Sequence, residues 1–209
     1  MKIFVTHYTL LTDRKNHILR QLNRFHLDSE FIVGYDKESL TEDDLKIFNI
    51  NKLSLAEISL TMKHIEAYKQ VFKYHDYALI LEDDVILSKD FDKQLDKYIQ
   101  QLPNDWDMLF IGDGCYLHVP QDIIQNGVNV YRAPSSRCTD SYLISKKCTK
   151  QILNDIYKNN FIIEKPIDHL LNHFIDKFDL KNFWAEPTIT TQGTQVGLFK
   201  TSINERGRL

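Results

Sequence analysis

The chain has 209 residues, of which 43% are apolar and 26% are charged, enough material for the core of one globular domain. The formal net charge of -3 gives no positive field that would attract a polyanion, which argues against nucleic acid as a main partner. The three cysteines lack a CxxC spacing and indicate reduced thiols, and the first residues resemble neither a signal peptide nor a membrane span. We therefore expect a cytoplasmic protein without a transmembrane segment.

Short apolar runs alternate with helical patterns along the chain. The apolar runs predict strands over residues 2–8, 30–34, 77–81, 107–112 and 141–145. The helical patterns predict a helix with Thr12 as its N-cap, a long helix that begins with the capping box Ser54–Glu57, a helix with Phe91 to Leu102 on its apolar side, and helices over 146–158 and 167–178. The apolar stripe of the long helix contains Ile58, Met62, Ile65, Tyr68 and Phe72.

This alternation is typical of an α/β fold. It predicts a mixed, mostly parallel central sheet with helices on both faces. The second half of the chain is less regular, with loops at turn-forming sequences such as 112–114 and 125–127. Because the chain has no internal repeat and no interdomain linker, we expect a single domain.

Three adjacent carboxylates, Glu82, Asp83 and Asp84, follow the strand predicted over 77–81. In open α/β sheets, ligands bind beyond the carboxyl ends of the strands. Residues two apart on an extended chain point the same way, so Glu82 and Asp84 can converge while Asp83 faces elsewhere. Two converging carboxylates suit Mg²⁺ or Mn²⁺ bound together with phosphate oxygens. The alternative is an acidic turn that leads into a helix, and phosphatases, response regulators and nucleotidyltransferases share the pattern.

Several segments, in order, resemble one known family. They are Glu57–His64, Ala78–Val85, Asp105–Gly112, Asp140–Ser145, Pro166–Asp168, Glu186–Ile189 and Gln192–Gly193. In these segments the chain is similar to the LPS-type glycosyltransferases of family 25, which include bacterial lipooligosaccharide galactosyltransferases and collagen hydroxylysine galactosyltransferases. The likeness extends over nearly the whole chain.

The resemblance implies a GT-A-like nucleotide-sugar-binding domain and an inverting transfer from a UDP-sugar with Mn²⁺ or Mg²⁺. Glu82 and Asp84 would take the place of the DxD-type metal motif, although a glutamate at the first position departs from it. The sugar would be galactose or glucose, and the acceptor a hydroxyl on a glycan or a hydroxylysine-type side chain. We expect residues 1–112 to bind donor and metal, and residues 113–209 to bind the acceptor.

Polar residues near the ends of the first strands are candidates for contacts to the nucleotide. Thr6 and His7 close the first strand, where GT-A proteins seat the base, and Asp36 follows the second. Arg14 lies in the first turn of a helix, an unfavourable place for a cation, which favours contact with phosphate. The expected nucleotide contacts are Thr6, His7, Arg14, Asp36, Lys63 and Asp83, and the alternative for each is ordinary surface or loop polarity. His64 could support the acidic strand end or could be a packed core residue.

The transfer needs a base that takes the proton of the acceptor hydroxyl. Asp168 is the first choice because it matches the Pro-Ile-Asp element of the family, and Asp140 and Asp113 are the reserves. A carboxylate at position 168 would also stabilise the dipole of its helix, so either role accounts for it. The polar segment 190–197 could close over the donor as a lid or be an inert loop.

Two other functions stay open. One is another metal-dependent enzyme of nucleotide diphosphates, such as a nucleotidyltransferase or phosphoesterase, although no glycine-rich phosphate loop accompanies the carboxylates. The other is a catalytically silent module that binds nucleotide sugars.

Overall fold

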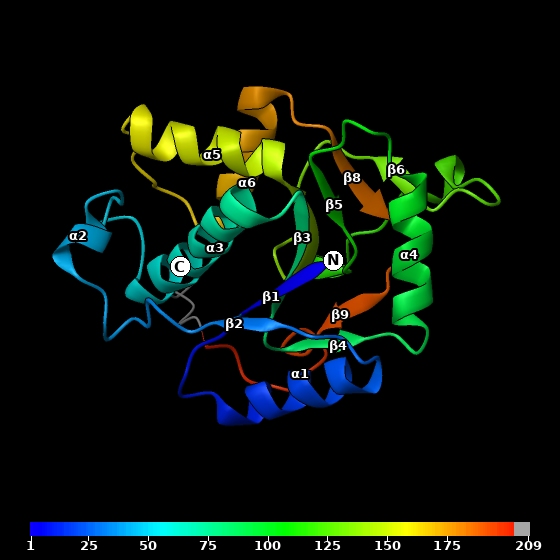
Figure 1. Ribbon diagram of the computed structural model, residues 1–209, viewed down its shortest axis with the longest axis horizontal. Helices are drawn as coiled ribbons and strands as arrows, with labels where there is room; N and C mark the ends of the chain where they lie inside the picture. Colours follow the sequence, from blue (N-terminus) through cyan, green and yellow to red (C-terminus); the bar gives the residue numbers. More distant parts are fainter. Residues whose placement is uncertain (203–209) are drawn as a thin grey trace.

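The computed structural model describes residues 1–202, and a seven-stranded sheet forms its centre (Figure 1). The strands are β1 (Lys2–Thr6), β2 (Glu30–Ile32), β3 (Tyr77–Glu82), β5 (Met108–Phe110), β6 (Val130–Arg132), β7 (Ser141–Ser145) and β8 (Asn182–Ala185). Their order is β2-β1-β3-β7-β5-β8-β6, and only β7 and β6 run against the others. This confirms the predicted α/β fold with a mixed, mostly parallel sheet.

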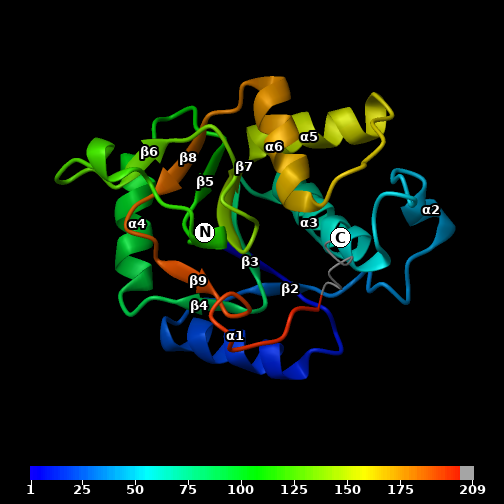
Figure 2. The same ribbon diagram turned by 180° about the vertical axis from the view of Figure 1, so that it is seen from behind.

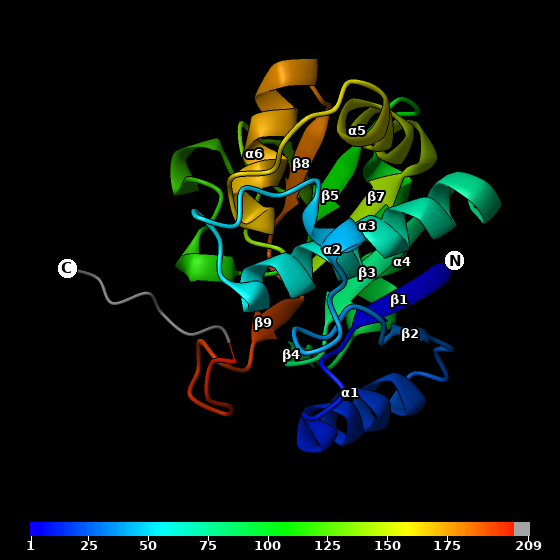
Figure 3. The same cartoon turned by 90° about the vertical axis from the view of Figure 1, so that its left-hand side faces the viewer.

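Helices cover both faces of the sheet, as the sequence predicts. The helices are α1 (Thr12–Arg24), α2 (Glu42–Leu45), α3 (Leu55–Tyr74), α4 (Phe91–Gln101), α5 (Lys146–Lys158) and α6 (Ile167–Phe178), with short 3-10 turns at Gly114–Tyr116 and Gln121–Ile123. Figures 1 and 2, seen from opposite sides, place α3, α5 and α6 on one face and α1 and α4 on the other. Figure 3 shows the same separation of α1 from α3 across β1.

The side chains of β3 explain why its sequence is continuously apolar. Ala78 and Ile80 pack into the core beneath α3, α5 and α6, whereas Leu79 and Leu81 pack into the core beneath α1 and α4. Successive side chains of a strand point to opposite faces, so a strand with both faces covered needs apolar residues at every position. The polar residues that follow therefore mark the point where β3 leaves the core.

A second, two-stranded sheet joins the acidic turn to the end of the described chain. β4 (Val85–Leu87) pairs antiparallel with β9 (Thr190–Gln192). The predicted polar loop over 190–197 thus begins as a strand, because its backbone completes the ladder of β4. The backbone N–H of Gly193 also donates to the carbonyl of Asp84, at 2.9 Å.

The predicted helix starts had different outcomes. The capping box of α3 is confirmed, since the Ser54 hydroxyl accepts from the Glu57 N–H and the Glu57 carboxylate accepts from the Ser54 N–H. Thr12 is not an N-cap, because it is already the first residue of α1 and Leu11 precedes it without a side-chain cap.

Phe72 is 41% exposed instead of buried in the stripe of α3, because it lines an open surface cavity with Trp106. None of the helices within residues 1–202 is both long and apolar enough to cross a membrane.

Candidate active site

The acidic turn lies at the carboxyl ends of β1 and β3. Thr6, the last residue of β1, is in register with Glu82, the last residue of β3. His7 therefore lies beside Asp83, and the two side chains contact each other at 2.7 Å between Nδ1 and Oδ2. Parallel strands that end together place these polar groups at one edge of the sheet, where α/β proteins bind ligands.

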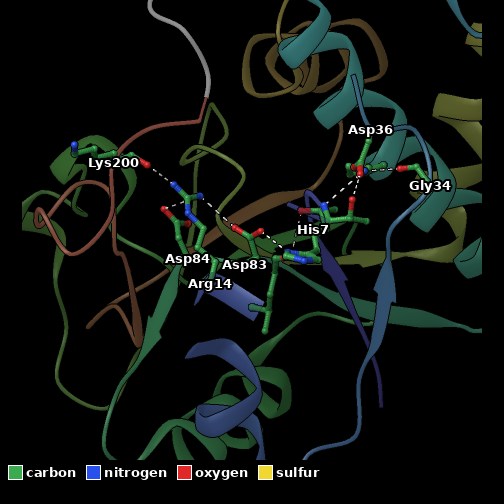
Figure 4. Close-up of polar contacts among 11 residues, drawn as sticks. His7, Arg14, Gly34, Asp36, Asp83, Asp84 and Lys200 are labelled. Carbon is green, nitrogen blue, oxygen red and sulfur yellow. Dashed lines mark hydrogen bonds and ion pairs between the residues drawn. The ribbon is translucent and has the colours of Figure 1, made fainter. Parts of the chain in front are cut away.

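Arg14 neutralises the acidic turn from the first turn of α1. Its Nη1 lies 3.2 Å from Oδ1 of Asp83 and 3.7 Å from Oδ2 of Asp84, and its Nη2 donates to the carbonyl of Lys200 at 2.5 Å (Figure 4). The guanidinium also lies over the ring of Phe199. The turn's carboxylates account for a buried cation at a helix start, where the helix dipole alone would disfavour it.

Lys63 and Asp36 form a second buried ion pair. Nζ of Lys63 donates to Oδ1 of Asp36 at 2.6 Å and to the carbonyl of Gly34 at 2.5 Å. Figure 4 shows Asp36 and Gly34 close together on the far side of His7 from Arg14. Burial lowers the pKa of Lys63, and Asp36 opposes this effect. For Asp36, hydrogen bonds from Lys63 and Thr9 outweigh the effect of burial and lower the pKa of the carboxyl.

A pocket, which we name the Arg14 pocket, opens beside these pairs. Its walls include Arg14, Lys37 and Lys63 as cations, together with Glu82 and Asp83. Of the predicted nucleotide contacts, the structure brings together five at this pocket, which are Thr6, His7, Arg14, Lys63 and Asp83. Asp36 is not in the wall but holds Lys63 in place.

Four carboxylates, Glu82, Asp84, Asp113 and Asp140, form what we name the acidic cluster. Burial raises the pKa of Asp84 to about 6, and the charge of Glu82 adds to this effect. Burial also raises the pKa of Asp140 well above its ordinary value, with contributions from Glu82, Asp84 and Asp113. Within residues 1–202, the Oδ1 atoms of Asp84, Asp113 and Asp140 are buried without a hydrogen-bond partner.

The acidic cluster fits a hard divalent cation in its chemistry. Buried carboxylate oxygens without partners are costly, and their mutual repulsion is relieved by a cation. Carboxylate oxygens are the ligands that Mg²⁺ and Mn²⁺ prefer. No group of three or more His, Cys, Asp or Glu side chains in the described part of the chain is arranged to hold a metal ion. Glu82 and Asp84 thus offer carboxylate oxygens of the type that the sequence suggested, without a complete protein cage.

Two glycines allow loops to approach this cluster closely. A Cβ atom at Gly112 would lie 2.1 Å from Oδ2 of Asp140, and one at Gly193 would lie 2.5 Å from the carbonyl oxygen of Asp84. Any other residue would force these neighbours apart. Gly112, which the sequence placed in a loop, and Gly193, which it placed in the segment 190–197, therefore have a packing role at the site.

A second pocket lies on the other side of Glu82 and is here named the Asp168 pocket. Asp168 lines it from the first turn of α6, with Glu57, Thr139 and Gln192 from other elements. Among residues 1–202, no lysine or arginine lines it. Glu82 belongs to the walls of both pockets, so the end of β3 separates a pocket with cations from a pocket with carboxylates.

The sequence suggested Asp140 as a reserve base facing the acceptor, but the structure buries its side chain. It is 1% exposed, its Oδ2 accepts from the Ser141 hydroxyl at 2.8 Å, and it lines neither of these two pockets. The reason is that Asp140 directly precedes the buried strand β7 and pairs through its carbonyl with the N–H of Glu82. It belongs to the acidic cluster behind the pockets.

Two functional neighbours gave no signal in the sequence. Thr139 donates its hydroxyl to Oε1 of Glu82 at 2.8 Å. Arg137 is fully buried, donates to the carbonyls of Gly112 and Ala185, and lies over the ring of Trp184. Both come from an irregular segment in which no periodicity reveals which side chains point inward.

Solved structures with similar architecture have low sequence identity. A galactosyltransferase LgtC in complex with donor and acceptor sugar analogs matches with a TM-score of 0.46 and 13% identity over 88% of this chain and 73% of that one. A Drosophila β1,4-galactosyltransferase 7 in complex with manganese, UDP-Gal and xylobiose gives 0.43 and 12%, over 89% of this chain and 65% of that one. A putative glucose-1-phosphate thymidylyltransferase from Bacillus anthracis gives 0.46 and 12%, over 92% and 89%. The chain thus spans about two thirds of the Drosophila protein.

The sequence itself matches a family over most of its length. The family is described as glycosyltransferase family 25 (LPS biosynthesis protein), and the match covers residues 1–171. This range includes β1, α3, the acidic turn and Asp168. The chain belongs to glycosyltransferase family 25.

Proposed function

We propose that the chain transfers galactose or glucose, with inversion, from a UDP-sugar to an acceptor hydroxyl on a glycan or a hydroxylysine-type side chain. In this proposal, the Arg14 pocket binds the donor and the Asp168 pocket binds the acceptor. Glu82, which lines both pockets, and Asp84, which is 1% exposed and lines neither, hold Mn²⁺ or Mg²⁺. The observation that carries the proposal is the position of Glu82 in the walls of both pockets, with cations on one side and carboxylates on the other.

The cations of the Arg14 pocket suit a nucleotide diphosphate. Arg14 presents a planar guanidinium, which binds phosphate oxygens in a fixed orientation, and Lys63 supplies a buried charge. His7 and Thr6 close the pocket at the end of β1, and Asp36 fixes the direction of Lys63. Asp83 holds both Arg14 and His7, so we assign it a role in orienting the residues that contact the donor.

A divalent cation bound at Glu82 and Asp84 would neutralise the charge that develops on the departing diphosphate, an effect of several kcal/mol. The chain's own contribution is to keep these two carboxylates close together and to bury Asp84. The unpartnered Oδ1 of Asp84 supports this assignment.

Asp168 is our candidate for the base. Its carboxylate is partly exposed in the pocket opposite the cationic wall, so it can accept the proton of an acceptor hydroxyl. Within residues 1–202 no lysine or arginine lines this pocket, so a negatively charged acceptor group would face the carboxylates of Glu57, Glu82 and Asp168 without either cation to offset them. We therefore expect the accepting residue to be neutral or positively charged.

The two rival functions make different predictions for products. A nucleotidyltransferase would consume or release pyrophosphate, and a silent module would bind UDP without turnover. The separation of a cationic pocket from an acidic one favours transfer from a phosphate-bearing donor to an acceptor without phosphate, since a nucleotidyltransferase that joins two phosphorylated substrates would need cations for both.

The proposal is tested by incubating the full chain with UDP-galactose or UDP-glucose, with Mn²⁺ or with EDTA, and measuring UDP and pyrophosphate. We expect UDP to form only with the metal, and the Asp84→Ala variant to lose this activity. Release of pyrophosphate, or full activity in Asp84→Ala, would contradict the proposal. A matched control is Asp179→Ala, because Asp179 is exposed and lies at the end of α6, away from both pockets.

A further inference from the structure

A buried row of polar side chains runs from the core to Glu82. The hydroxyl of Tyr68 lies 2.6 Å from the hydroxyl of Tyr142, which lies 2.8 Å from Nδ1 of His64. Nε2 of His64 then lies 3.7 Å from Oε1 of Glu82. Tyr68, Tyr142 and His64 are each at most 1% exposed, and the rings of His64 and Tyr142 are stacked.

The direction of the hydrogen bonds follows from the partners that each atom has. The hydroxyl of Tyr68 has only the Tyr142 oxygen as partner within residues 1–202, and burial raises the pKa of both phenols, so both keep their protons. If Tyr68 donates to Tyr142, then Tyr142 donates to Nδ1 of His64. The ring hydrogen of His64 is then on Nε2, the atom that faces Glu82.

This Nε2 atom is buried and has no hydrogen-bond partner in the described part of the chain. A polar N–H left in this state is costly, and Oε1 of Glu82 is the acceptor next to it. Thr139 already donates to the same oxygen at 2.8 Å. The other carboxylate oxygen of Glu82, Oε2, takes part in no hydrogen bond within residues 1–202.

We infer that His64 is a positioning residue for Glu82: its neutral ring directs Nε2–H at Oε1, so that Oε1 faces His64 and Thr139 and Oε2 faces the cation. The inference rests on the proposed function, because it assigns Glu82 to the metal. Groups that orient a ligand in this way contribute about 10- to 100-fold to metal affinity. Tyr142 and Tyr68 act through His64 by fixing which ring nitrogen carries the hydrogen.

Two substitutions separate this role from simple core packing. In His64→Gln, the amide nitrogen reaches about as far as Nε2 and can still donate to Glu82, but the bond to Tyr142 is lost. In His64→Asn, the amide reaches about as far as Nδ1 and can still bond Tyr142, but no donor faces Glu82. Both variants lose the aromatic ring, and because Asn is one methylene shorter than Gln, thermal unfolding in EDTA measures the remaining difference in packing.

The measurement is the affinity for Mn²⁺ by calorimetry in the presence of UDP, with thermal unfolding in EDTA as a check on folding. We expect His64→Asn to bind Mn²⁺ about 10- to 100-fold more weakly than the unmodified chain, and His64→Gln to stay within about threefold of it. Tyr142→Phe should lower the affinity by an intermediate factor. Equal affinities in the two His64 variants, or stronger binding in His64→Asn, would overturn the inference.

A further variant, Glu82→Gln, distinguishes failure of the inference about His64 from failure of the proposed metal site. If Glu82→Gln loses Mn²⁺ affinity while the two His64 variants remain equal, the metal site stands and the role of His64 is wrong. If Glu82→Gln binds Mn²⁺ as well as the unmodified chain, the proposed metal site itself is wrong. If a His64 variant does not fold, Tyr142→Phe gives the same comparison with the ring of His64 in place.

Discussion

Arg14 and Asp83 lie 3.2 Å apart between Nη1 and Oδ1, although one belongs to the first turn of α1 and the other to the turn after β3. The same guanidinium holds the carbonyl of Lys200 and lies near Asp84. Arg14 thus connects the first helix, the acidic turn and the last described segment at one wall of the proposed donor pocket. Its planar group reaches all three partners at once.

Replacement of Arg14 by lysine should not preserve its function. An ammonium group cannot reproduce the fork that contacts Asp83 and Lys200 together, so Arg14→Lys should weaken UDP binding about as much as Arg14→Met. We expect a loss of about tenfold or more in each, since charge-assisted hydrogen bonds contribute about 1.5–3 kcal/mol. Calorimetric titration with UDP measures it. Unchanged affinity in Arg14→Lys would show that only a point charge is needed.

The sequence is sufficient to predict five of the seven strands of the central sheet and the acidic turn, because these follow from local patterns, but it does not predict β6 or β8. The apolar run 77–81 is long enough to identify a strand covered on both faces, and the polar residues after it mark the end of that strand. The capping box at Ser54 fixes the start of α3 in the same way. Local hydrogen bonds and periodicity determine these features, so they can be predicted from the sequence without knowledge of the tertiary structure.

The missed features depend on contacts between distant residues. β9 is a strand only because β4 pairs with it, and Asp140 is buried only because β7 lies between β3 and β5. The cysteines Cys115 and Cys138 lie 3.3 Å apart between their Sγ atoms although 23 positions separate them. No local pattern encodes such pairs.

Asp84 should destabilise the metal-free protein as pH rises. The pKa of its carboxyl is about 6 in the folded chain against an ordinary 3.8, so between about pH 4 and about pH 6 the unfolded chain has released a proton that the folded chain retains. The contribution of this carboxyl to the free energy of unfolding is fully present below about pH 4 and is lost as the pH rises through about 6. The Asp84→Asn variant should remove this loss.

We therefore expect Asp84→Asn to unfold at a higher temperature than the unmodified chain in EDTA at pH 7.5, and to show a flatter decline between pH 4 and pH 6. The same variant should lose most transferase activity. Thermal unfolding followed by circular dichroism provides the comparison. If the metal-free variant is less stable than the unmodified chain at pH 7.5, Asp84 is held mainly by Arg14 and Thr194, and its assignment to a cation is weakened.

Asp168→Asn should reduce turnover without affecting the fold. The carboxylate is partly exposed and its hydrogen bond is to the adjacent N–H of His169, which an asparagine oxygen can also accept. We expect kcat to fall by about 10²–10⁴-fold, as for loss of a general base, with donor affinity unchanged. Steady-state kinetics at saturating donor measure this. A rise in acceptor KM with kcat unchanged would assign Asp168 to acceptor binding instead.

Lys63 and Asp36 should behave as a coupled pair. Lys63→Met leaves the carboxylate of Asp36 without its partner, and loss of one member of a buried pair costs about 3 kcal/mol or more. Adding Asp36→Asn to Lys63→Met should recover much of the stability but not the affinity for UDP. Chemical denaturation and UDP titration of both single variants and the double variant give the stabilities and UDP affinities for a double-mutant cycle. Recovery of UDP affinity in the double variant would exclude direct contact between Lys63 and the donor.

The account is tested most directly by locating the cation. Crystals of the full chain soaked with UDP and Mn²⁺ would be measured at a wavelength where manganese scatters anomalously. We predict a single strong anomalous peak within coordination distance of carboxylate oxygens of both Glu82 and Asp84, with the diphosphate in the Arg14 pocket. A peak away from these two side chains, or UDP bound in the Arg14 pocket with no manganese beside it, would contradict the central claim.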